Sequence, residues 1–457
     1  MPTSINPTTG QQISDYPVHT PAEVDAALEA AAVAQRAWRE TSITERSALL
    51  TAIAVELRAG KERFASLITE EMGKPITEAR GEVEKSAVTL DYYAANAERF
   101  LSFEEIESNA TLSGVEFDPL GVVLAIMPWN YPFWQFFRFA GPALVAGNGA
   151  ILKHANNVPG SALLIQEIVE KAGAPKGLFS TLIIDSSEVS KIIADDRIAA
   201  VTLTGSTEVG AIVAAQAGSV LKKQVLELGG SDPFIVLEDA DLEQAATVAV
   251  KSRFNTAGQS CVNAKRFLVV EAVADAFVEL FVAKASELVV GDPSQDATQV
   301  GPLARGNLRV TLHEQVERTI AAGATVRLGA ELPDGQGFFY PPTILDHVGT
   351  DAAAFTEETF GPVASVTRVV DADEAVRLAN SSEYGLGATI FSADVDRARA
   401  LARRVDSGAV FINGQVASDA RLPFGGIKRS GYGRELSGYG IREFVNIKTI
   451  WVGPVSA

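Results

Sequence analysis

The chain has 457 residues, of which 47% are hydrophobic and 21% are charged, and its formal net charge is −18. This length predicts a globular protein of two or three domains. The net negative charge argues against nucleic acid or an anionic membrane as the main partner. The N-terminus lacks the pattern of a signal peptide, and no apolar run is long enough to predict a membrane span.

Cysteine and histidine usage narrows the expected chemistry. Cys261 is the single cysteine, so an intramolecular disulfide is impossible, and the four histidines are scattered. We therefore expect a cytoplasmic protein without a metal site.

The first hundred residues predict helices. Thr20 and Pro21 can cap and open a first helix, a second runs from about Thr44 to near Gly60, and a third spans about 74–100.

From residue 121, short apolar runs alternate with helical segments. This pattern is typical of buried parallel strands and predicts a doubly wound α/β fold. The strand candidates are 121–127, 149–153, 180–184, 199–205, 224–230 and 233–238. A second series follows Cys261, with strands at 265–271, 385–391 and 408–414, a helix at 273–289, and a surface connection at 333–342.

Cys261 is a candidate nucleophile. A lone buried cysteine usually acts as a small hydrophobic residue, but Gly258, Gln259 and Ser260 form a small polar approach to this one. No histidine lies nearby to suggest a cysteine protease. A thiolate without a partner imidazole suits an electrophile such as an aldehyde.

Two further residues could serve the same chemistry. Glu227 ends an apolar strand, where partial desolvation would favour a general base, although a helix cap or salt bridge explains it equally well. Asn130 follows an apolar strand and could stabilise an oxyanion, or it could simply occupy a proline-rich turn.

The segment 205–210, Gly-Ser-Thr-Glu-Val-Gly, joins a strand to an alanine-rich helix. Glycines at such a turn allow backbone N–H groups to approach a phosphate. The spacing departs from the usual dinucleotide fingerprint, and many glycine-rich turns are only turns.

Together these segments resemble the aldehyde dehydrogenase superfamily over essentially the whole chain. The motifs that carry the resemblance are PWN at 128–130, Lys153 in LKHANNVP, GSTEVG at 205–210, ELGG at 227–230, GQSC at 258–261, EETFGPV at 357–363 and PFGGIKRSGYGRE at 423–435. The resemblance implies an α/β fold with a Rossmann-like cofactor domain (1–102 and 120–228), an α/β catalytic domain (229–435) and a small β extension (103–119 and 436–457). It also implies a homodimer or homotetramer built through that extension.

The resemblance implies a mechanism in which Cys261 adds to an aldehyde and the Asn130 amide and the Cys261 N–H hold the oxyanion. Hydride transfer to the nicotinamide leaves a thioester, which Glu227 hydrolyses by activating water. Glu435 matches a second glutamate that assists proton transfer in some relatives, or it is merely an exposed glutamate.

By the same resemblance, Lys153 contacts the adenine ribose, and Glu358 and Phe360 position the nicotinamide riboside. Trp129, Leu228, Gly205, Ser206 and Gly210 complete the expected cofactor site. NAD-preferring relatives often carry a glutamate where this chain has Asn156, so we predict NADP, with NAD as the weaker alternative. Lys153, and His154 as a second candidate, would supply positive charge there.

Arg138 lies eight residues after Asn130, a spacing found in members specific for succinate semialdehyde. Its guanidinium could bind a terminal carboxylate through two hydrogen bonds, although a structural salt bridge is the alternative. Ser418 is expected near the same carboxylate. Trp134 and Ser260 are the other predicted substrate contacts.

One position departs from that pattern, because some such members have a second arginine six residues before the cysteine. Here Asn255 stands there, and the nearest arginine is Arg253. Either one arginine and hydroxyls hold the carboxylate, or the substrate is another short ω-carboxylated aldehyde such as glutarate semialdehyde.

Two other classes stay open. A catalytically silent binding or structural relative would be expected to lose Cys261, Glu227 or Asn130, and all three are present. Acylating relatives that use coenzyme A generally lack the general base, so Glu227 argues against that branch.

Overall fold

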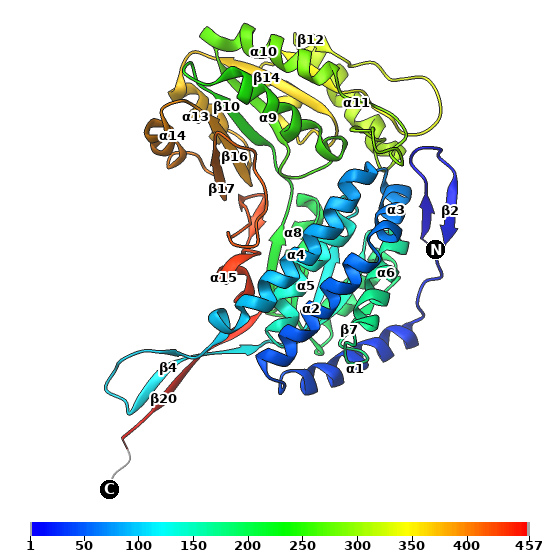
Figure 1. The fold of residues 1–457 in the computed structure, drawn as a ribbon, viewed down its shortest axis with the longest axis vertical. Coiled ribbons are helices and arrows are strands. Elements are labelled where there is room, and N and C mark those ends of the chain that lie inside the picture. The colour runs from blue at the N-terminus through cyan, green and yellow to red at the C-terminus, as the bar shows by residue number, and fades with distance from the viewer. Residues whose placement is uncertain (1, 455–457) are drawn as a thin grey trace.

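The computed structural model describes residues 2–454, which form two lobes and a projecting β extension (Figure 1). Within these residues, no helix combines the length and apolar composition that crossing a membrane requires.

The N-terminal helices begin where the sequence predicts. Helices α1 (Pro21–Trp38) and α2 (Ile43–Ala59) open with capping boxes, in which Thr20 pairs with Glu23 and Ser42 with Glu45. The predicted third helix is α4 (Ile76–Leu101). The sequence reading missed α3 (Lys61–Met72), because Gly60 both ends α2 and precedes α3 without a side-chain cap. It also missed the hairpin of β1 (Thr3–Ile5) and β2 (Gln12–Asp15).

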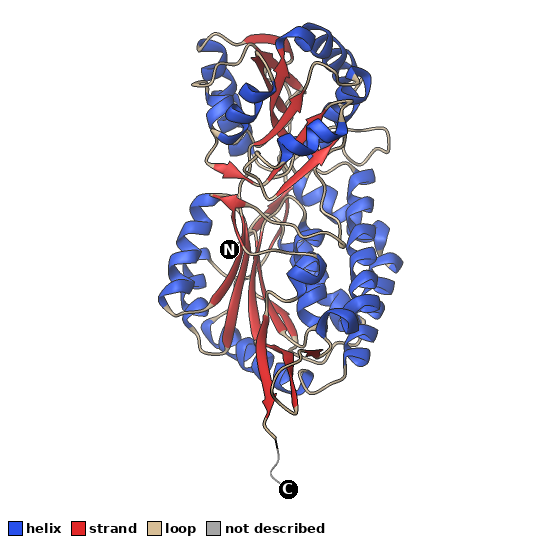
Figure 2. Ribbon diagram, turned by 90° about the vertical axis from the view of Figure 1, so that its left-hand side faces the viewer, coloured by secondary structure: helices blue, strands red, loops and turns tan. Residues whose placement is uncertain are grey.

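The first lobe contains a six-stranded sheet in the order β19-β9-β8-β5-β6-β7, with helices on both faces (Figure 2). Its parallel strands are β5 (Val122–Met127), β6 (Gly149–His154), β7 (Phe179–Thr181), β8 (Ile198–Thr204) and β9 (Lys223–Glu227). The connecting helices are α5 (Pro132–Val145), α6 (Pro159–Lys171), α7 (Val189–Ala194) and α8 (Thr207–Ser219). Strand β5 lies between β6 and β8, so the chain order reverses there and opens a crevice at the carboxyl ends of the strands.

The second lobe contains a seven-stranded sheet in the order β12-β13-β14-β11-β10-β16-β17. Its strands are β10 (Asp232–Val236), β11 (Ala264–Val270), β12 (Thr325–Leu328), β13 (Thr343–Asp346), β14 (Val363–Val369), β16 (Gly387–Phe391) and β17 (Ala409–Ile412). The helices of this lobe are α9 (Leu242–Phe254), α10 (Glu271–Ser286), α11 (Gly306–Ala321), α12 (Ala353–Thr356), α13 (Ala372–Asn380) and α14 (Val395–Ala402). Only β12 is antiparallel to its neighbour among the strand pairs of this sheet.

The chain returns to the first lobe after β17. Strand β18 (Ile427–Lys428) pairs with the short β15 (Tyr384–Gly385), and β19 (Gly431–Tyr432) pairs antiparallel with β9. Residues 431–432, which the sequence reading assigned to the catalytic domain, therefore join the sheet of the first lobe. Helix α15 (Ser437–Ile441) follows them.

The extension is a three-stranded antiparallel sheet in the order β20-β4-β3, which projects from the first lobe (Figure 1). It combines β3 (Glu104–Glu105), β4 (Leu112–Pro119) and β20 (Val445–Val452), so two distant segments pair as the sequence predicts. Residues 455–457 of the predicted extension lie outside the described residues.

Candidate active site

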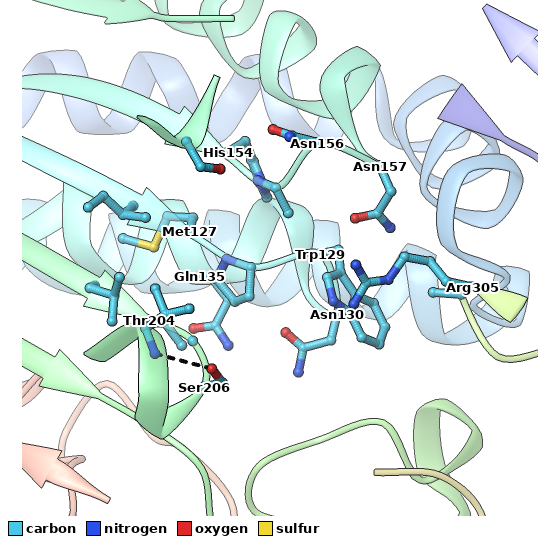
Figure 3. A pocket seen from close by; sticks show the side chains of 18 of the residues that line it. Met127, Trp129, Asn130, Gln135, His154, Asn156, Asn157, Thr204, Ser206 and Arg305 are labelled. Atoms are coloured by element: carbon cyan, nitrogen blue, oxygen red, sulfur yellow. Dashed lines mark hydrogen bonds between the residues drawn. The ribbon is translucent and has the colours of Figure 1, made fainter. Parts of the chain in front are cut away.

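A cavity of about 1150 Å³ opens at the carboxyl ends of β5, β6 and β8, where the sheet order reverses (Figure 3). It is large enough for a dinucleotide. Most of the predicted cofactor residues line it, together with two of the predicted catalytic residues: Trp129, Asn130, Lys153, Asn156, Gly205, Ser206, Leu228, Cys261, Glu358 and Phe360.

A second, smaller cavity of about 120 Å³ also has Cys261 in its lining. The four predicted substrate residues all line it: Trp134, Arg138, Ser260 and Ser418. Cys261 thus stands between a large cavity and a small one, which is the arrangement that a reaction between a nucleotide and a short substrate requires.

The loop before Cys261 is bent and anchored. Thr256 and Ala257 have left-handed backbone conformations, with φ of 55° and 51°, and such strain persists only where the surroundings hold it. Glu78 on α4 accepts hydrogen bonds from the Thr256 N–H and hydroxyl, each at 2.9 Å. Gln259 accepts a hydrogen bond from the Ala304 N–H.

The surroundings of the half-buried Cys261 disfavour its thiolate form. Burial raises its pKa to about 12, against the opposing effect of Arg138 and Lys265. A base must therefore remove the proton before the sulfur attacks, because the thiolate is the nucleophilic form.

Asn130 directs its amide at the same loop. Its Nδ2 donates a hydrogen bond to the Gln259 carbonyl oxygen at 3.0 Å, while Oδ1 has no partner. The second Nδ2 hydrogen remains for an oxyanion formed beside Cys261.

Glu227 is buried, and its pKa is raised well above the usual range by burial and then by the charge of Glu435. A raised pKa suits a general base near neutral pH. Its carboxylate lines neither cavity and instead approaches Gly425, where an added Cβ would lie 2.7 Å from Glu227 Oε1. The side chain must turn to reach a thioester on Cys261.

Arg138 and Glu435 form a buried ion pair, with exposed fractions of 2% and 4%. The alternative of an exposed glutamate at position 435 is therefore wrong. The salt bridge considered for Arg138 is present, yet Arg138 also lines the small cavity. Its guanidinium packs 4.7 Å from the Phe424 ring centroid and approaches the Thr204 hydroxyl at 3.4 Å.

Arg253 has a structural role. It is fully buried and donates hydrogen bonds to the carbonyl oxygens of Ala264, Gly258, Thr359 and Gly361. It ties the nucleophile loop to the 359–361 segment and does not line the small cavity. Asn255 does line that cavity.

The sequence reading missed Lys85. It lies on α4, lines the small cavity and donates a hydrogen bond to the Ser418 hydroxyl at 2.7 Å. Its Nζ is 4.3 Å from the Trp134 ring centroid. No local motif marks Lys85, because α4 carries many charged residues that face solvent.

The cofactor cavity has positive charge and free hydrogen-bonding capacity. Lys153 is buried and donates a hydrogen bond to Asn156 Oδ1 at 2.8 Å. Asn157, drawn in Figure 3, lines the cavity with a buried Nδ2 that has no partner. A phosphorylated ribose fits this pair of donors, since it supplies acceptors for both.

His154 does not contribute a positive charge. Burial lowers its pKa to about 4, and its Nε2 lies 2.9 Å from the Pro132 carbonyl oxygen. The expectation that His154 adds to the charge of Lys153 is therefore wrong.

The turn at 205–210 has two separate functions. Gly205 and Ser206 line the cavity, and Ser206 caps α8 by accepting a hydrogen bond from the Val209 N–H (Figure 3). Gly210 lies outside the lining, where an added Cβ would be 2.4 Å from Leu228 Cδ2. Gly210 thus allows α8 to pack closely on Leu228.

Glu358 and Phe360 also line the large cavity. Glu358 Oε1 accepts a hydrogen bond from the Gly230 N–H at 3.0 Å and lies 3.3 Å from Lys265 Nζ. The Phe360 ring meets Trp129 edge to face, with centroids 5.7 Å apart. Trp129 in turn lies beside Arg305 (Figure 3).

Among residues 2–454, no group of three or more histidine, cysteine or acidic side chains is placed to hold a metal ion. The chemistry proposed below does not require one.

Comparison with known proteins agrees with this geometry. The sequence profile of the aldehyde dehydrogenase family matches residues 2–450. The chain is 52% identical over 448 residues to an Escherichia coli protein named succinate semialdehyde dehydrogenase, NAD(P)+, covering 98% of this chain and 97% of that protein. It is 48% identical over 449 residues to a probable NADP+ succinate-semialdehyde dehydrogenase from Synechocystis, covering 98% and 99% of the two chains.

A solved structure of a relative also matches this chain. The crystal structure of succinic semialdehyde dehydrogenase from Streptococcus pyogenes in complex with NADP+ matches with a TM-score of 0.97 and 39% identity, covering 99% of this chain and all of that one. The chain belongs to the aldehyde dehydrogenase family.

Proposed function

We propose that this enzyme oxidises succinate semialdehyde to succinate with NADP+, and with NAD+ as the weaker alternative. The observation that carries the proposal is the small cavity beside Cys261, which is lined by Arg138, Lys85 and Lys251 and by no aspartate or glutamate among the described residues. In a chain of net charge −18, such a cavity selects a short anionic substrate. The names of the relatives from Escherichia coli, Synechocystis and Streptococcus pyogenes support the same substrate.

The first chemical step requires a base and an oxyanion donor. Glu227, with its raised pKa, takes the proton of the Cys261 thiol directly or through water, and the sulfur adds to the aldehyde carbon. The free Nδ2 hydrogen of Asn130 and the backbone N–H of Cys261 stabilise the resulting oxyanion.

NADP+ bound in the large cavity supplies the hydride acceptor for the oxidation. Lys153, Asn156 and Asn157 would hold its adenine side, and Glu358 and Phe360 would hold its nicotinamide side.

The remaining step releases the acid from Cys261. Glu227 first releases the thiol proton to solvent. It then turns towards the sulfur and takes a proton from water while the water oxygen adds to the thioester carbon, and the Cys261 thiolate leaves. The buried Glu435 lies close enough to influence the pKa of Glu227. We assign it a role in accepting that proton.

The division of labour between the lobes is part of the proposal. We assign 1–102 and 120–228 to cofactor binding, 229–435 to catalysis, and 103–119 with 436–457 to assembly of a homodimer or homotetramer. Strand β20 supports the last assignment, because it is an unpaired sheet edge exposed on both faces. We place the enzyme in the cytoplasm, where a catalytic thiol stays reduced.

Product analysis tests the reaction class. We expect one NADPH and one succinate per succinate semialdehyde consumed, with no dependence on coenzyme A. Coenzyme A dependence would indicate the acylating branch. Absence of turnover with succinate semialdehyde, glutarate semialdehyde and butanal would indicate a silent relative.

A further inference from the structure

Lys85 is a cation without a matching anion. It is half-buried, and its Nζ has one hydrogen-bond partner within residues 2–454, the neutral hydroxyl of Ser418 at 2.7 Å. Its other close neighbour is the face of the Trp134 ring, 4.3 Å from Nζ. No carboxylate forms an ion pair with it in the described part of the chain, whereas the buried Lys74 pairs with Glu82.

The charged groups around Lys85 do not neutralise its ammonium. Arg138 and Lys74 lower the pKa of the Lys85 ammonium, whereas Glu82 and Asp419 raise it. Each of the two carboxylates is engaged elsewhere. Glu82 pairs with Lys74 and accepts hydrogen bonds from the first N–H groups of α5, and Asp419 pairs with Arg421.

Burial and Arg138 together lower the pKa of Lys85 to about 8. Arg138 already has Glu435 as its partner, whereas Lys85 has no carboxylate partner in the described part of the chain, so a charged Lys85 in this partly desolvated cavity is unfavourable unless an anion enters. Cys261 also lines this cavity, so the anion that enters it can be part of the reacting molecule.

We propose that Lys85 is the second cation that binds the distal carboxylate of the substrate, beside Arg138. The proposal rests on the proposed function, since it assumes a substrate with a carboxylate. Lys85 lines the same cavity as Asn255, the position at which some succinate-semialdehyde members carry a second arginine. Ser418, which accepts a hydrogen bond from Lys85, keeps its own hydroxyl hydrogen free to donate to the same carboxylate.

The first experiment compares two substrates. In Lys85→Met, kcat/KM for succinate semialdehyde should fall by about tenfold to a hundredfold, mainly through KM, because one charge-assisted hydrogen bond is lost. For butanal, which has no carboxylate, kcat/KM should stay within about twofold. Lys85→Arg should restore most of the loss.

A matched control is Lys176→Met, which removes an exposed lysine that lines neither cavity. It should change neither substrate by more than about twofold. An equal loss in Lys176→Met and Lys85→Met would show that the general positive field matters and would overturn the proposal. Equal losses for succinate semialdehyde and butanal in Lys85→Met would leave Lys85 only a structural role.

The pH profile provides a readout that a structural role would not change. The ratio of kcat/KM for succinate semialdehyde to that for butanal cancels ionisations common to both, such as that of Cys261. In the wild type this ratio should fall as pH rises through about 8, because the ammonium loses its proton. In Lys85→Arg the ratio should stay flat to pH 10, and a fall that persists there would contradict the assignment.

A third measurement separates this proposal from the choice of substrate. Succinate and glutarate should inhibit butanal oxidation by occupying the small cavity, and Lys85→Met should weaken that inhibition about tenfold. The wild type could show no preference for succinate semialdehyde while Lys85→Met still weakens the inhibition. In that case the proposed function is wrong, but the binding of a carboxylate by Lys85 is supported. If neither acid inhibits the wild type, no carboxylate binds there and Lys85 has no such role.

Discussion

Arg138 forms an ion pair with Glu435 and also lines the small cavity. The single change Arg138→Ala would strand the buried Glu435, a loss of about 3–5 kcal/mol. It would therefore damage the fold and both kinds of substrate together. The double variant Arg138→Met with Glu435→Gln removes both charges and keeps the volume.

We predict that this double variant folds with a melting temperature near that of the wild type. Its kcat/KM for succinate semialdehyde should fall about tenfold to a hundredfold further than that for butanal, because only the first substrate loses a charge-assisted contact. Steady-state kinetics with both aldehydes and a thermal melt check this. Equal losses for both substrates would mean that Arg138 serves the ion pair alone.

Asn156 controls the charge beside Lys153. Asn156→Glu places a carboxylate where a 2′-phosphate would bind and offers an acceptor to a 2′-hydroxyl. We predict that the NADP+ to NAD+ ratio of kcat/KM falls by at least about tenfold, equivalent to about 1.4 kcal/mol. An unchanged ratio would place the phosphate elsewhere in the cavity.

The sequence was informative about residues that stand in short motifs. Cys261, Asn130, Lys153 and Ser206 come together in the lining of one cavity, and their roles there stay predictions. It was less informative about side-chain direction and distant partners. Neither the orientation of Glu227 away from the cavities nor the pairing of Arg138 with Glu435, nearly 300 positions away, leaves a local signal. Lys85 was missed for the same reason.

At the scale of elements, α4 connects the nucleophile loop to the first lobe. Its Glu78 holds the left-handed Thr256, and burial raises the pKa of Glu78 to about 7 although Lys74 opposes the shift. The ordinary value for a glutamate is about 4.3. The folded state therefore binds an extra proton between these values, and the stability contributed by this group is present below about pH 4.3 and lost as pH rises through about 7.

We predict that Glu78→Gln, which keeps an acceptor for Thr256 but cannot ionise, removes this dependence. The melting temperature of the wild type relative to the variant should fall as pH rises from 5 to 8. Thermal melts across that range check the result. A difference that does not change with pH would show that Glu78 ionises normally in the folded protein.

The boundaries of several elements were predicted from the residues at or next to their ends. Thr20 and Pro21 predicted the start of α1, and apolar runs predicted β5, β6 and β8. The predicted start of the second helix near Thr44 lies one residue from the observed start of α2 at Ile43. The run 180–184 gave only a short β7, because an apolar run indicates burial and not the length of pairing. Gly60 concealed the boundary of α3 for the opposite reason, since one residue ends α2 and starts α3.

At the scale of the whole molecule, the β extension is the part through which we expect subunits to assemble. Ile447 and Trp451 on β20 are 59% and 53% exposed on an unpaired edge. We predict that Ile447→Glu or Trp451→Glu shifts the protein to a smaller species in size-exclusion chromatography with light scattering. Val370→Glu, at a position 75% exposed in the second lobe, is the control and should leave the mass unchanged. A wild type that is already monomeric would exclude this role.

The pairing of β4 with β20 joins segments more than 300 residues apart, and the family resemblance predicted it where local pattern had no information. The return of β19 to the first sheet was not predicted, because a two-residue strand has no periodicity.

The measurement that tests the substrate assignment most directly is the wild-type kcat/KM for succinate semialdehyde against that for butanal, with saturating NADP+. Lys85, Arg138 and the Ser418 hydroxyl, which all line the small cavity, should make the ratio at least about a hundredfold, since each charge-assisted hydrogen bond contributes about 1.5–3 kcal/mol. A ratio near one, or a preference for butanal, would contradict a carboxylate-binding cavity and with it the proposed function.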